Sequence, residues 1–375
     1  MTRAETYLDW NATAPLRPEA RAAMTVALQH CGNPSSVHRR GRAARRLVEE
    51  ARAAVAALVG APPESVVFTS GGTEANALAL CGNGRARILV SAVEHAAVLE
   101  AVPEAVRIPV DGDGIVLLAA LDKLLTADPR PVLVSVMLAN NETGVIEPAA
   151  AIAEIAHRYG ALYHCDAVQA AGKVPLDVAA LGADLLTLSA HKLGGPPGVG
   201  ALVIRQGLDL APLLRGGGQE RGRRAGTENL PGIAGFGAAA QAALAQMPVW
   251  EHVRGLRQAL ESAVIGAAPE AVVIAAAAPR LPNTAAIAMP GTPAETQVIA
   301  LDLDGVMVSA GAACSSGKVR TSHVLEAMGA GPELAGSTIR VSLGWETGEA
   351  DIARLLDAWT ALYRRRHNSK ERRAA

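Results

Sequence analysis

Lys192 follows an apolar run, 185–189, and precedes a loop rich in glycine and proline, 194–198. A lysine at the end of a buried strand can lose its proton through desolvation and then attack an aldehyde, as Schiff-base lysines do. Taken alone, the pattern also fits an exposed structural lysine. Polar clusters elsewhere in the chain favour the chemical interpretation.

Asp166 directly follows a second apolar run, 161–165. A buried carboxylate beside the ring nitrogen of pyridoxal phosphate keeps that nitrogen protonated, and the protonated ring can then withdraw electrons from a bound amino acid. Asp166 could equally cap the segment that starts at Ala167, and the two roles are compatible. The pair Lys192 and Asp166 therefore raises the hypothesis of a pyridoxal phosphate site.

The segment 70–74, Ser-Gly-Gly-Thr-Glu, lies between a predicted strand and a predicted helix over Ala75–Leu80. Glycines let backbone N–H groups turn toward an anion, and the helix dipole adds about half a positive charge at that end. A phosphate could bind there without any lysine. The alternative is an ordinary glycine-rich turn with Thr73 as the helix cap, and the motif alone leaves both open.

His95 and Asn141 follow two further apolar runs, and Arg340 lies in a predicted strand near the C-terminus. An imidazole can stack on a flat heteroaromatic ring and transfer protons near neutral pH. A guanidinium can hold a substrate carboxylate with two parallel hydrogen bonds. The competing interpretations are a surface histidine and a structural ion pair.

Cys314 lies in a run of small residues, 308–317. Such a segment packs poorly but lets a thiol move between a substrate and an acceptor. The alternative is a buried structural cysteine. Cys31, Cys81 and Cys165 are too scattered for a disulfide framework or a paired metal site, so we expect free thiols.

Composition sets the broad class of the protein. The chain has 375 residues, of which 50% are hydrophobic and only 3% aromatic, so we expect a helix-rich α/β protein with an Ala, Leu, Val and Ile core. A net charge of −1 gives no long-range field to attract nucleic acid or an anionic membrane. The first residues lack a leader pattern and no apolar stretch could span a membrane, which favours a cytoplasmic protein.

Five apolar runs alternate with helical patterns, as in a parallel sheet covered by helices. They are 65–68, 87–90, 132–138, 161–165 and 185–189. Because ligands bind at the carboxyl ends of such strands, the polar clusters should converge on one crevice. A smaller α+β part should follow, with a helix over 251–264, strands over 272–274, 284–289 and 339–342, and a last helix over 350–363. We therefore predict a large domain over 14–250, a small one over 1–13 and 251–375, and a frayed tail over 364–375.

Together these motifs closely resemble cysteine desulfurases of the NifS/IscS type, within the class V aminotransferase group of fold-type I pyridoxal phosphate enzymes. The resemblance runs from about Tyr7 to Leu356 and is carried by the segments 32–36, 68–74, 140–144, 189–192, 215–229 and 311–315. It implies a large domain with a mostly parallel sheet between helices and a smaller α+β domain.

The resemblance also implies roles for individual residues. Lys192 would hold the cofactor, Asp166 would pair with its ring nitrogen and His95 would stack on the ring. The remaining cofactor contacts would come from Gly72, Thr73, Asn141, Gln169, Ser189, His191 and, from the neighbouring subunit of a homodimer, Thr227.

The implied reaction takes sulfur from L-cysteine and releases L-alanine. Arg340 and Asn141 would bind the substrate, His95 would handle thiol protons, and Cys314 would carry the sulfur as a persulfide to an acceptor or iron–sulfur scaffold protein. Cys314 could also ligate a transient iron–sulfur cluster. Another class V activity, such as a selenocysteine lyase or an aminotransferase, and a catalytically silent assembly partner are the alternatives.

Two segments depart from the family pattern. Residues 194–198 read Gly-Gly-Pro-Pro-Gly, where relatives usually carry a large residue and a basic one, and the tail after Arg364 is shorter than in housekeeping relatives. The partner protein could therefore differ. The length of the segment 309–329 is typical of the subgroup with a long mobile cysteine loop.

Overall fold

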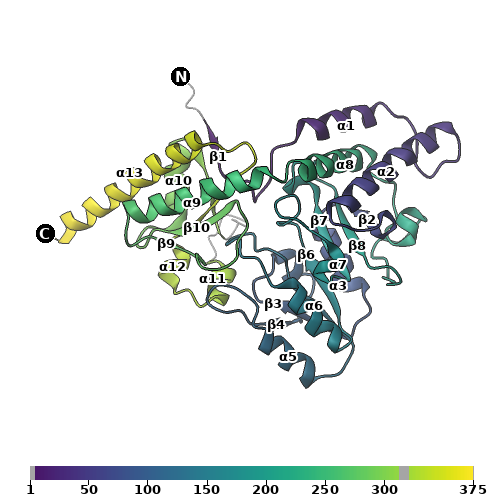
Figure 1. Ribbon diagram of the computed structural model, residues 1–375, viewed down its shortest axis with the longest axis horizontal. Helices are drawn as coiled ribbons and strands as arrows, with labels where there is room; N and C mark the ends of the chain where they lie inside the picture. Colours follow the sequence, from purple (N-terminus) through teal and green to yellow (C-terminus); the bar gives the residue numbers. More distant parts are fainter. Residues whose placement is uncertain (1–4, 312–320, 375) are drawn as a thin grey trace.

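The computed structural model describes residues 5–311 and 321–374, with side chains to Arg366. Figure 1 shows two parts, a larger one around an extended sheet and a smaller one that includes the C-terminal helix. Two strands, β1 (Thr6–Tyr7) and β11 (Val306–Met307), pair in parallel and attach the N-terminal segment to the smaller part.

The larger part is built on a seven-stranded sheet in the order β2-β8-β7-β6-β5-β3-β4. The strands are β2 (Val66–Thr69), β3 (Arg87–Ser91), β4 (Val106–Ile108), β5 (Val132–Ser135), β6 (Leu162–Asp166), β7 (Leu185–Ser189) and β8 (Gly200–Ile204). Only β8 runs against its neighbours, so the five strands expected from the sequence all point the same way. We did not expect β8 from the sequence. The predicted strand 132–138 is shorter in the structure, where β5 ends at Ser135. Two further backbone hydrogen bonds to β6 continue the pairing to Leu138.

Helices cover both faces of this sheet. Val66 and Phe68 of β2 point into one core and Val67 into another, as expected for a strand buried on both sides. The helices of this part are α1 (Pro18–Leu28), α2 (Arg39–Leu58), α3 (Gly72–Gly82), α4 (Ala96–Leu99), α5 (Leu118–Ala127), α6 (Ala149–Arg158), α7 (Val178–Leu181) and α8 (Leu230–Ala245). Three short 3-10 turns, η1 (Pro63–Ser65), η2 (Ala190–Lys192) and η3 (Gln219–Gly222), complete it.

Small residues let α1, α2 and α8 pack closely on one side of the sheet (Figure 1). A Cβ atom added to Gly237 of α8 would lie 2.6 Å from the Cα of Ala51 in α2, so only glycine fits there. Ala44 and Ala240 are fully buried in the same core. The expected core of small aliphatic side chains is confirmed.

The smaller part has its own sheet and core. Strands β9 (Val272–Val273), β10 (Thr284–Ala288), β12 (Ser309–Ala310) and β13 (Thr338–Ser342) form an antiparallel sheet in the order β12-β13-β10-β9. Its helices are α9 (Val249–Ala267), α10 (Ala294–Leu303), α11 (His323–Ala327), α12 (Pro332–Gly336) and α13 (Glu349–Ala374). Trp250, Leu260 and Trp359 belong to a core separate from that of the large sheet. The boundaries 14–250, and 1–13 with 251–375, remain a proposal that these separate cores support.

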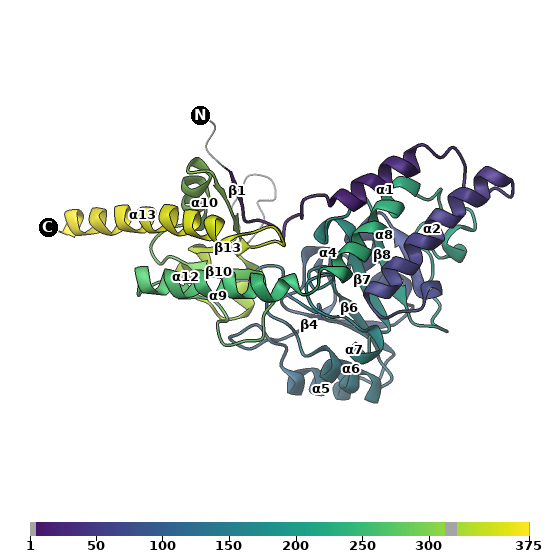
Figure 2. The same cartoon turned by 45° about the horizontal axis from the view of Figure 1, so that its top comes forward.

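The tail is one correction to the sequence prediction. We expected residues 364–375 to fray, but α13 continues without a break to Ala374 and extends away from the body (Figure 2). The reason is compositional, because 349–374 holds neither glycine nor proline and many Ala, Leu, Arg and Glu residues. Among the described residues, no helix is both long and apolar enough to span a bilayer. The expected cytoplasmic location stays a prediction.

Candidate active site

The candidate site lies at the carboxyl edge of the large sheet. Asp166 ends β6, Ser189 ends β7, and the glycine turn before α3 follows β2. Because β8 is antiparallel to both β2 and β7, these strands end at the same edge as β3, which precedes His95. The expectation that the polar clusters follow strands with a common carboxyl edge is confirmed.

The amine of Lys192 lies between two main-chain carbonyl groups. Its Nζ donates to the oxygen of Asn11 at 2.6 Å and to that of Ala12 at 2.8 Å. Burial lowers the pKa of Lys192 to about 8, the charge of Arg340 acts in the same direction, and Asp9 and Asp166 oppose it. A neutral amine that donates both of its N–H groups keeps its lone pair free, so the arrangement suits a nucleophile or a base.

Asp166 is buried, with both carboxylate oxygens engaged. Oδ2 accepts a hydrogen bond from Nδ2 of Asn76 at 2.7 Å, and Oδ1 accepts one from the backbone N–H of Val168 at 2.9 Å. Both donors fix the carboxylate at the end of β6. The negative charge of Asp166 acts on the pKa of both Lys192 and His95, so the three side chains lie close to one another.

His95 caps the short helix α4. Its Nδ1 accepts a hydrogen bond from the backbone N–H of Ala97 at 3.0 Å, which places the proton of the neutral ring on Nε2. Burial lowers the pKa of His95, as do the charges of Lys192 and His323, while Asp166 acts against them. The ring therefore favours its neutral form and offers one N–H for proton transfer.

The amino end of α3 offers an anion site. Among the described side chains none caps this helix, whose N-cap is Gly71. A Cβ atom on Gly72 would lie 3.1 Å from Val168 and 3.4 Å from the Cβ of Ser189, so Gly72, Thr73 and Ser189 come together around this end. An uncapped helix terminus with close backbone approach suits a phosphate.

His191 lies one residue before Lys192, where its Nδ1 is 3.2 Å from the hydroxyl of Thr13. Burial lowers the pKa of His191 to about 4, and the charge of Lys192 adds to this effect. The ring is therefore neutral at pH 7 and can donate a hydrogen bond without carrying a charge.

Arg340 of β13 brings a guanidinium from the smaller part to the crevice. Nη2 donates to Oδ1 of Asp9 at 2.7 Å, and Nη1 donates to the main-chain oxygen of Asn141 at 3.0 Å. Its Nε is buried and lacks a partner among the described residues. A buried donor without an acceptor is costly, and a carboxylate ligand would supply one.

Sequence reasoning missed Asn11, which joins most of these groups. Its main-chain oxygen accepts hydrogen bonds from Lys192 and Gln169. Its side chain forms hydrogen bonds with Lys173, Asn283 and Thr284. Its Nδ2 also donates to the main-chain oxygen of Asn141 at 3.3 Å. The available signal was the polar segment 9–13 immediately after the first strand, which reads Asp-Trp-Asn-Ala-Thr. Gln169, expected to touch the cofactor, lies in this network.

Cys314 and its immediate neighbours, 312–320, lie outside the described residues. The residues on either side of that gap meet at Glu142. Ser322 Oγ donates to Oε2 of Glu142 at 2.5 Å, and a Cβ atom on Gly311 would lie 2.7 Å from the same oxygen. His323 lies 2.9 Å, through its Nε2, from the main-chain oxygen of Glu94, directly before His95. The chain therefore leaves and re-enters the described structure beside the crevice.

Thr227 lies exposed in the loop between η3 and α8, and the contacts found in the described part of this chain do not join it to Lys192 or Asp166.

Two ion pairs hold the turn η3 and the loop that follows it. Arg52 binds Glu220 at 2.7 Å with both side chains buried, and Arg224 binds Glu74 at 2.8 Å. Glu220 adopts a left-handed backbone conformation, with a φ of 46°, that its bond to Arg52 helps to hold.

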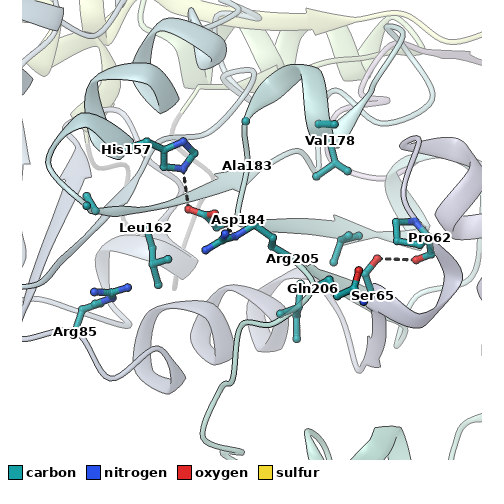
Figure 3. Close-up of a pocket in the computed structure, with 16 residues that line it drawn as sticks. Pro62, Ser65, Arg85, His157, Leu162, Val178, Ala183, Asp184, Arg205 and Gln206 are labelled. Atoms are coloured by element: carbon teal, nitrogen blue, oxygen red, sulfur yellow. Dashed lines mark hydrogen bonds and ion pairs between the residues drawn. The ribbon is translucent and has the colours of Figure 1, made fainter.

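A separate cavity of about 470 Å³ lies at the opposite edge of the sheet (Figure 3). Asp184 accepts hydrogen bonds there from His157 at 3.0 Å and from the backbone N–H of Tyr163, and it forms an ion pair with Arg205 at 2.6 Å. The Asp184 carboxylate is thus fully paired, and none of the predicted site residues lines the cavity.

Over 5–311 and 321–366 no group of His, Cys, Asp and Glu has the arrangement of a metal site. The predicted iron–sulfur role of Cys314 concerns a residue outside those ranges. Cys31 and Cys81 are exposed free thiols and Cys165 is a buried one.

Comparison with known proteins identifies the family. The family model described as aminotransferase class-V matches residues 6–355. The chain belongs to the class-V aminotransferase family. Members of this family use pyridoxal phosphate, and the site fits that group: Lys192 offers an amine for its aldehyde, Asp166 a carboxylate for its ring nitrogen, and α3 an uncapped terminus for its phosphate.

Within this family, the chain is 48% identical to a protein of Cereibacter sphaeroides named cysteine desulfurase, covering 94% of each chain. It is 42% identical to a protein of Dictyoglomus turgidum named cysteine desulfurase IscS, covering 94% of this chain and 93% of the relative. A solved NifS-like protein from Rickettsia africae superimposes with a TM-score of 0.90 at 35% identity, covering 96% of this chain and 99% of that one. The expected fold-type I architecture and the resemblance to NifS/IscS-type proteins are confirmed.

Proposed function

We propose that the protein is a cysteine desulfurase that converts L-cysteine into L-alanine and leaves the sulfur as a persulfide on Cys314. The carbon–sulfur bond of the substrate breaks and a sulfur–sulfur bond forms at Cys314. A proton replaces sulfur on the carbon, so cysteine is reduced to alanine while the two thiol sulfurs are oxidised to a persulfide. The exchange balances without an outside oxidant.

One observation carries the proposal. Lys192, with a pKa lowered to about 8, lies near Asp166, His95 and Arg340: the charges of Asp166 and Arg340 act on Lys192, and those of Asp166 and Lys192 act on His95. Lowered pKa values at Lys192 and His95, beside charged partners, are typical of a catalytic site. Similarity over nearly the full length to proteins named cysteine desulfurase favours this reaction among those that the family carries out.

Bound pyridoxal phosphate would supply an electron-withdrawing ring, held by Lys192, Asp166, His95, Asn141 and Gln169, with its phosphate on Gly72, Thr73, Ser189 and His191. Lys192 would take the α-proton of the substrate with its free lone pair. Arg340 would bind the substrate carboxylate beside Asn141, where its Nε has no other acceptor in the described structure. His95 would move thiol protons through its Nε2.

We further propose a homodimer in which Thr227 of the partner subunit completes the phosphate site. Thr227 is exposed, and apolar side chains near it and near the end of α1 face solvent in the single chain. Val37 is 87% exposed, Leu28 is 70% exposed and Leu214 is 47% exposed. Exposed apolar groups of this kind favour a protein interface. The persulfide would then pass to a sulfur acceptor, such as an iron–sulfur scaffold protein.

The test is to load the protein with pyridoxal phosphate, add L-cysteine and measure alanine. Cys314→Ala should abolish alanine formation while the visible absorbance of the bound cofactor persists. Cys31→Ala is the matched control, because Cys31 is an exposed thiol and should leave the rate unchanged. Alanine formation by Cys314→Ala at the wild-type rate would refute the role of Cys314, and wild-type protein that never acquires visible absorbance would favour a silent assembly partner.

A further inference from the structure

Lys173 is a buried lysine that the proposed reaction does not use. Its exposed fraction is 4%, and within residues 5–311 and 321–366 no carboxylate lies within ion-pair distance of its amine. Burial lowers its pKa well below the usual value, and the charges of Lys192 and Arg340 act in the same direction. Burying an amine without an acid partner is costly, so its surroundings should show what it contributes.

The Lys173 amine donates two hydrogen bonds, both to side-chain amide oxygens. Its Nζ lies 2.9 Å from Oδ1 of Asn11 and 2.9 Å from Oε1 of Gln169. Two N–H groups of the Lys173 amine are thus engaged by these two acceptors. Neither amide can rotate by half a turn without placing its NH2 group against this donor. Lys173 therefore fixes the orientation of the Gln169 amide and, together with Nδ2 of Asn283 at 3.1 Å, that of the Asn11 amide.

The opposite end of the Gln169 amide leads toward Lys192, whereas that of the Asn11 amide is held by Thr284. Nε2 of Gln169 donates to the main-chain oxygen of Asn11 at 3.0 Å, and Nδ2 of Asn11 donates to Thr284 at 2.8 Å. That same main-chain oxygen of Asn11 accepts from Nζ of Lys192 at 2.6 Å. An unbroken series of hydrogen bonds thus joins Lys173 through Asn11 and Gln169 to the Lys192 amine.

We propose that Lys173 is a positioning residue for Lys192, acting through the amides of Asn11 and Gln169. By holding both amide oxygens, it keeps the Gln169 N–H directed at the main-chain oxygen of Asn11 and so fixes the acceptor that receives the free Lys192 amine. The inference deepens the proposed function, because it rests on the role of Lys192 as the reactive amine. Lys173 itself touches neither substrate nor cofactor in this role.

Besides Lys173 itself, the charged or titratable groups around Lys192 are Asp9 near β1, Asp166 at the end of β6, Arg340 on β13 and the imidazoles of His95 and His191. Substitutions at Lys173 change none of these. Because Lys173 and Lys192 interact electrostatically, and Lys173→Met and Lys173→Gln remove the same amine, a difference between these two variants in the Lys192 pKa reports its position and its access to water. Desolvation is the main cause of the lowered pKa of Lys192, so loosened packing should raise it.

The experiment measures the pH midpoint of Lys192 reactivity in the protein without cofactor, by trace acetylation with acetic anhydride and peptide mass analysis. Lys173→Met keeps the length and removes both donors. It should raise the Lys192 midpoint from near 8 by about one unit, which leaves roughly tenfold less neutral amine at pH 7. Lys173→Gln, which keeps two N–H donors, should recover at least part of the shift. Lys123→Met on the exposed face of α5 is the control and should produce none.

An unchanged Lys192 midpoint in folded Lys173→Met protein overturns the inference, and so does an equal shift in Lys123→Met. If Lys173→Met does not fold, Gln169→Met interrupts the same series of bonds and must raise the midpoint by a similar amount. Failure of the proposed function has a different signature: wild-type protein with cofactor would make no alanine while its Lys192 midpoint stayed near 8.

Discussion

Nη2 of Arg340 lies 2.7 Å from Oδ1 of Asp9, so a strand of the smaller part is joined by an ion pair to the N-terminal segment. The same guanidinium donates to the main-chain oxygen of Asn141, which follows the large sheet. Arg340 is thus held from two sides before any substrate arrives. A group fixed in advance loses little conformational entropy on binding.

Replacing Arg340 by lysine should weaken the binding of L-cysteine more than it slows turnover. An ammonium group cannot form two parallel hydrogen bonds with a carboxylate. Loss of one charge-assisted bond, worth about 1.5–3 kcal/mol, should raise KM roughly tenfold to a hundredfold. Steady-state kinetics of alanine formation provides the measurement. Arg130→Lys, at an exposed arginine, is the control, and an unchanged KM in Arg340→Lys would contradict the assignment.

Replacing Asp166 by asparagine should leave a folded protein that binds the cofactor but turns over far more slowly. The amide keeps an acceptor for Val168 and removes the negative charge that the ring nitrogen requires. A loss of about 3 kcal/mol of stabilisation corresponds to a rate on the order of a hundredfold lower. Visible absorbance reports cofactor binding and alanine release reports the rate. Activity within about twofold of wild type would argue against the pairing.

Uptake of pyridoxal phosphate by cofactor-free protein should depend on the pKa of Lys192. Because this pKa is lowered to about 8, the neutral and nucleophilic amine dominates above that pH. The rate of absorbance change after mixing should therefore rise with pH up to about 8 and then level off. A rate that keeps rising toward the ordinary lysine value near 10.4 would show that the amine is not desolvated.

The buried ion pair between Arg52 and Glu220 should matter strongly for stability. Arg52→Met leaves the Glu220 carboxylate, 2% exposed, without its partner, and such changes cost about 3–5 kcal/mol. Arg46→Met removes a pair whose side chains are 73% and 63% exposed, so its cost should stay below about 1 kcal/mol. Urea denaturation compares the two. Equal free energies of unfolding would contradict the importance given to the buried pair.

Ser322→Ala should destabilise the segment that follows residues 312–320. It removes both the cap of α11, where the Leu325 N–H donates to Ser322 Oγ at 3.1 Å, and the bond to Glu142. We expect a cost of about 1–3 kcal/mol in the free energy of unfolding. The exposed Ser35→Ala is the control for denaturant unfolding, and a cost no larger than that of the control would show that the contact is weak.

Much of the large sheet could be predicted, because apolar runs that end in polar clusters are a local signal. Lys192, Asp166 and His95 each follow such a run and lie in one crevice. Strand β8 escaped prediction because it follows the glycine and proline loop after Lys192 and returns antiparallel. An apolar run in the sequence does not by itself show whether its strand is parallel or antiparallel to its neighbours.

The partners of the site residues could not be predicted, because they come from distant segments. Asn11 and Lys192 are 181 positions apart, and Asp9 and Arg340 are 331 apart. Lys173 occupies a run of small apolar residues, where a buried amine without an acid partner was not expected. Only the folded chain shows that its partners are two amide oxygens. The roles of the individual site residues stay predictions until they are tested.

The most direct test of the central claim follows the sulfur atom itself. Wild-type protein loaded with pyridoxal phosphate is mixed with L-cysteine for a single turnover, alanine is quantified, and peptide mass analysis without reductant locates any added sulfur. We expect alanine in amounts equal to the subunits, with one extra sulfur atom on the peptide that contains Cys314. Alanine without added sulfur at Cys314, or added sulfur on Cys31 or Cys81 instead, would contradict the account.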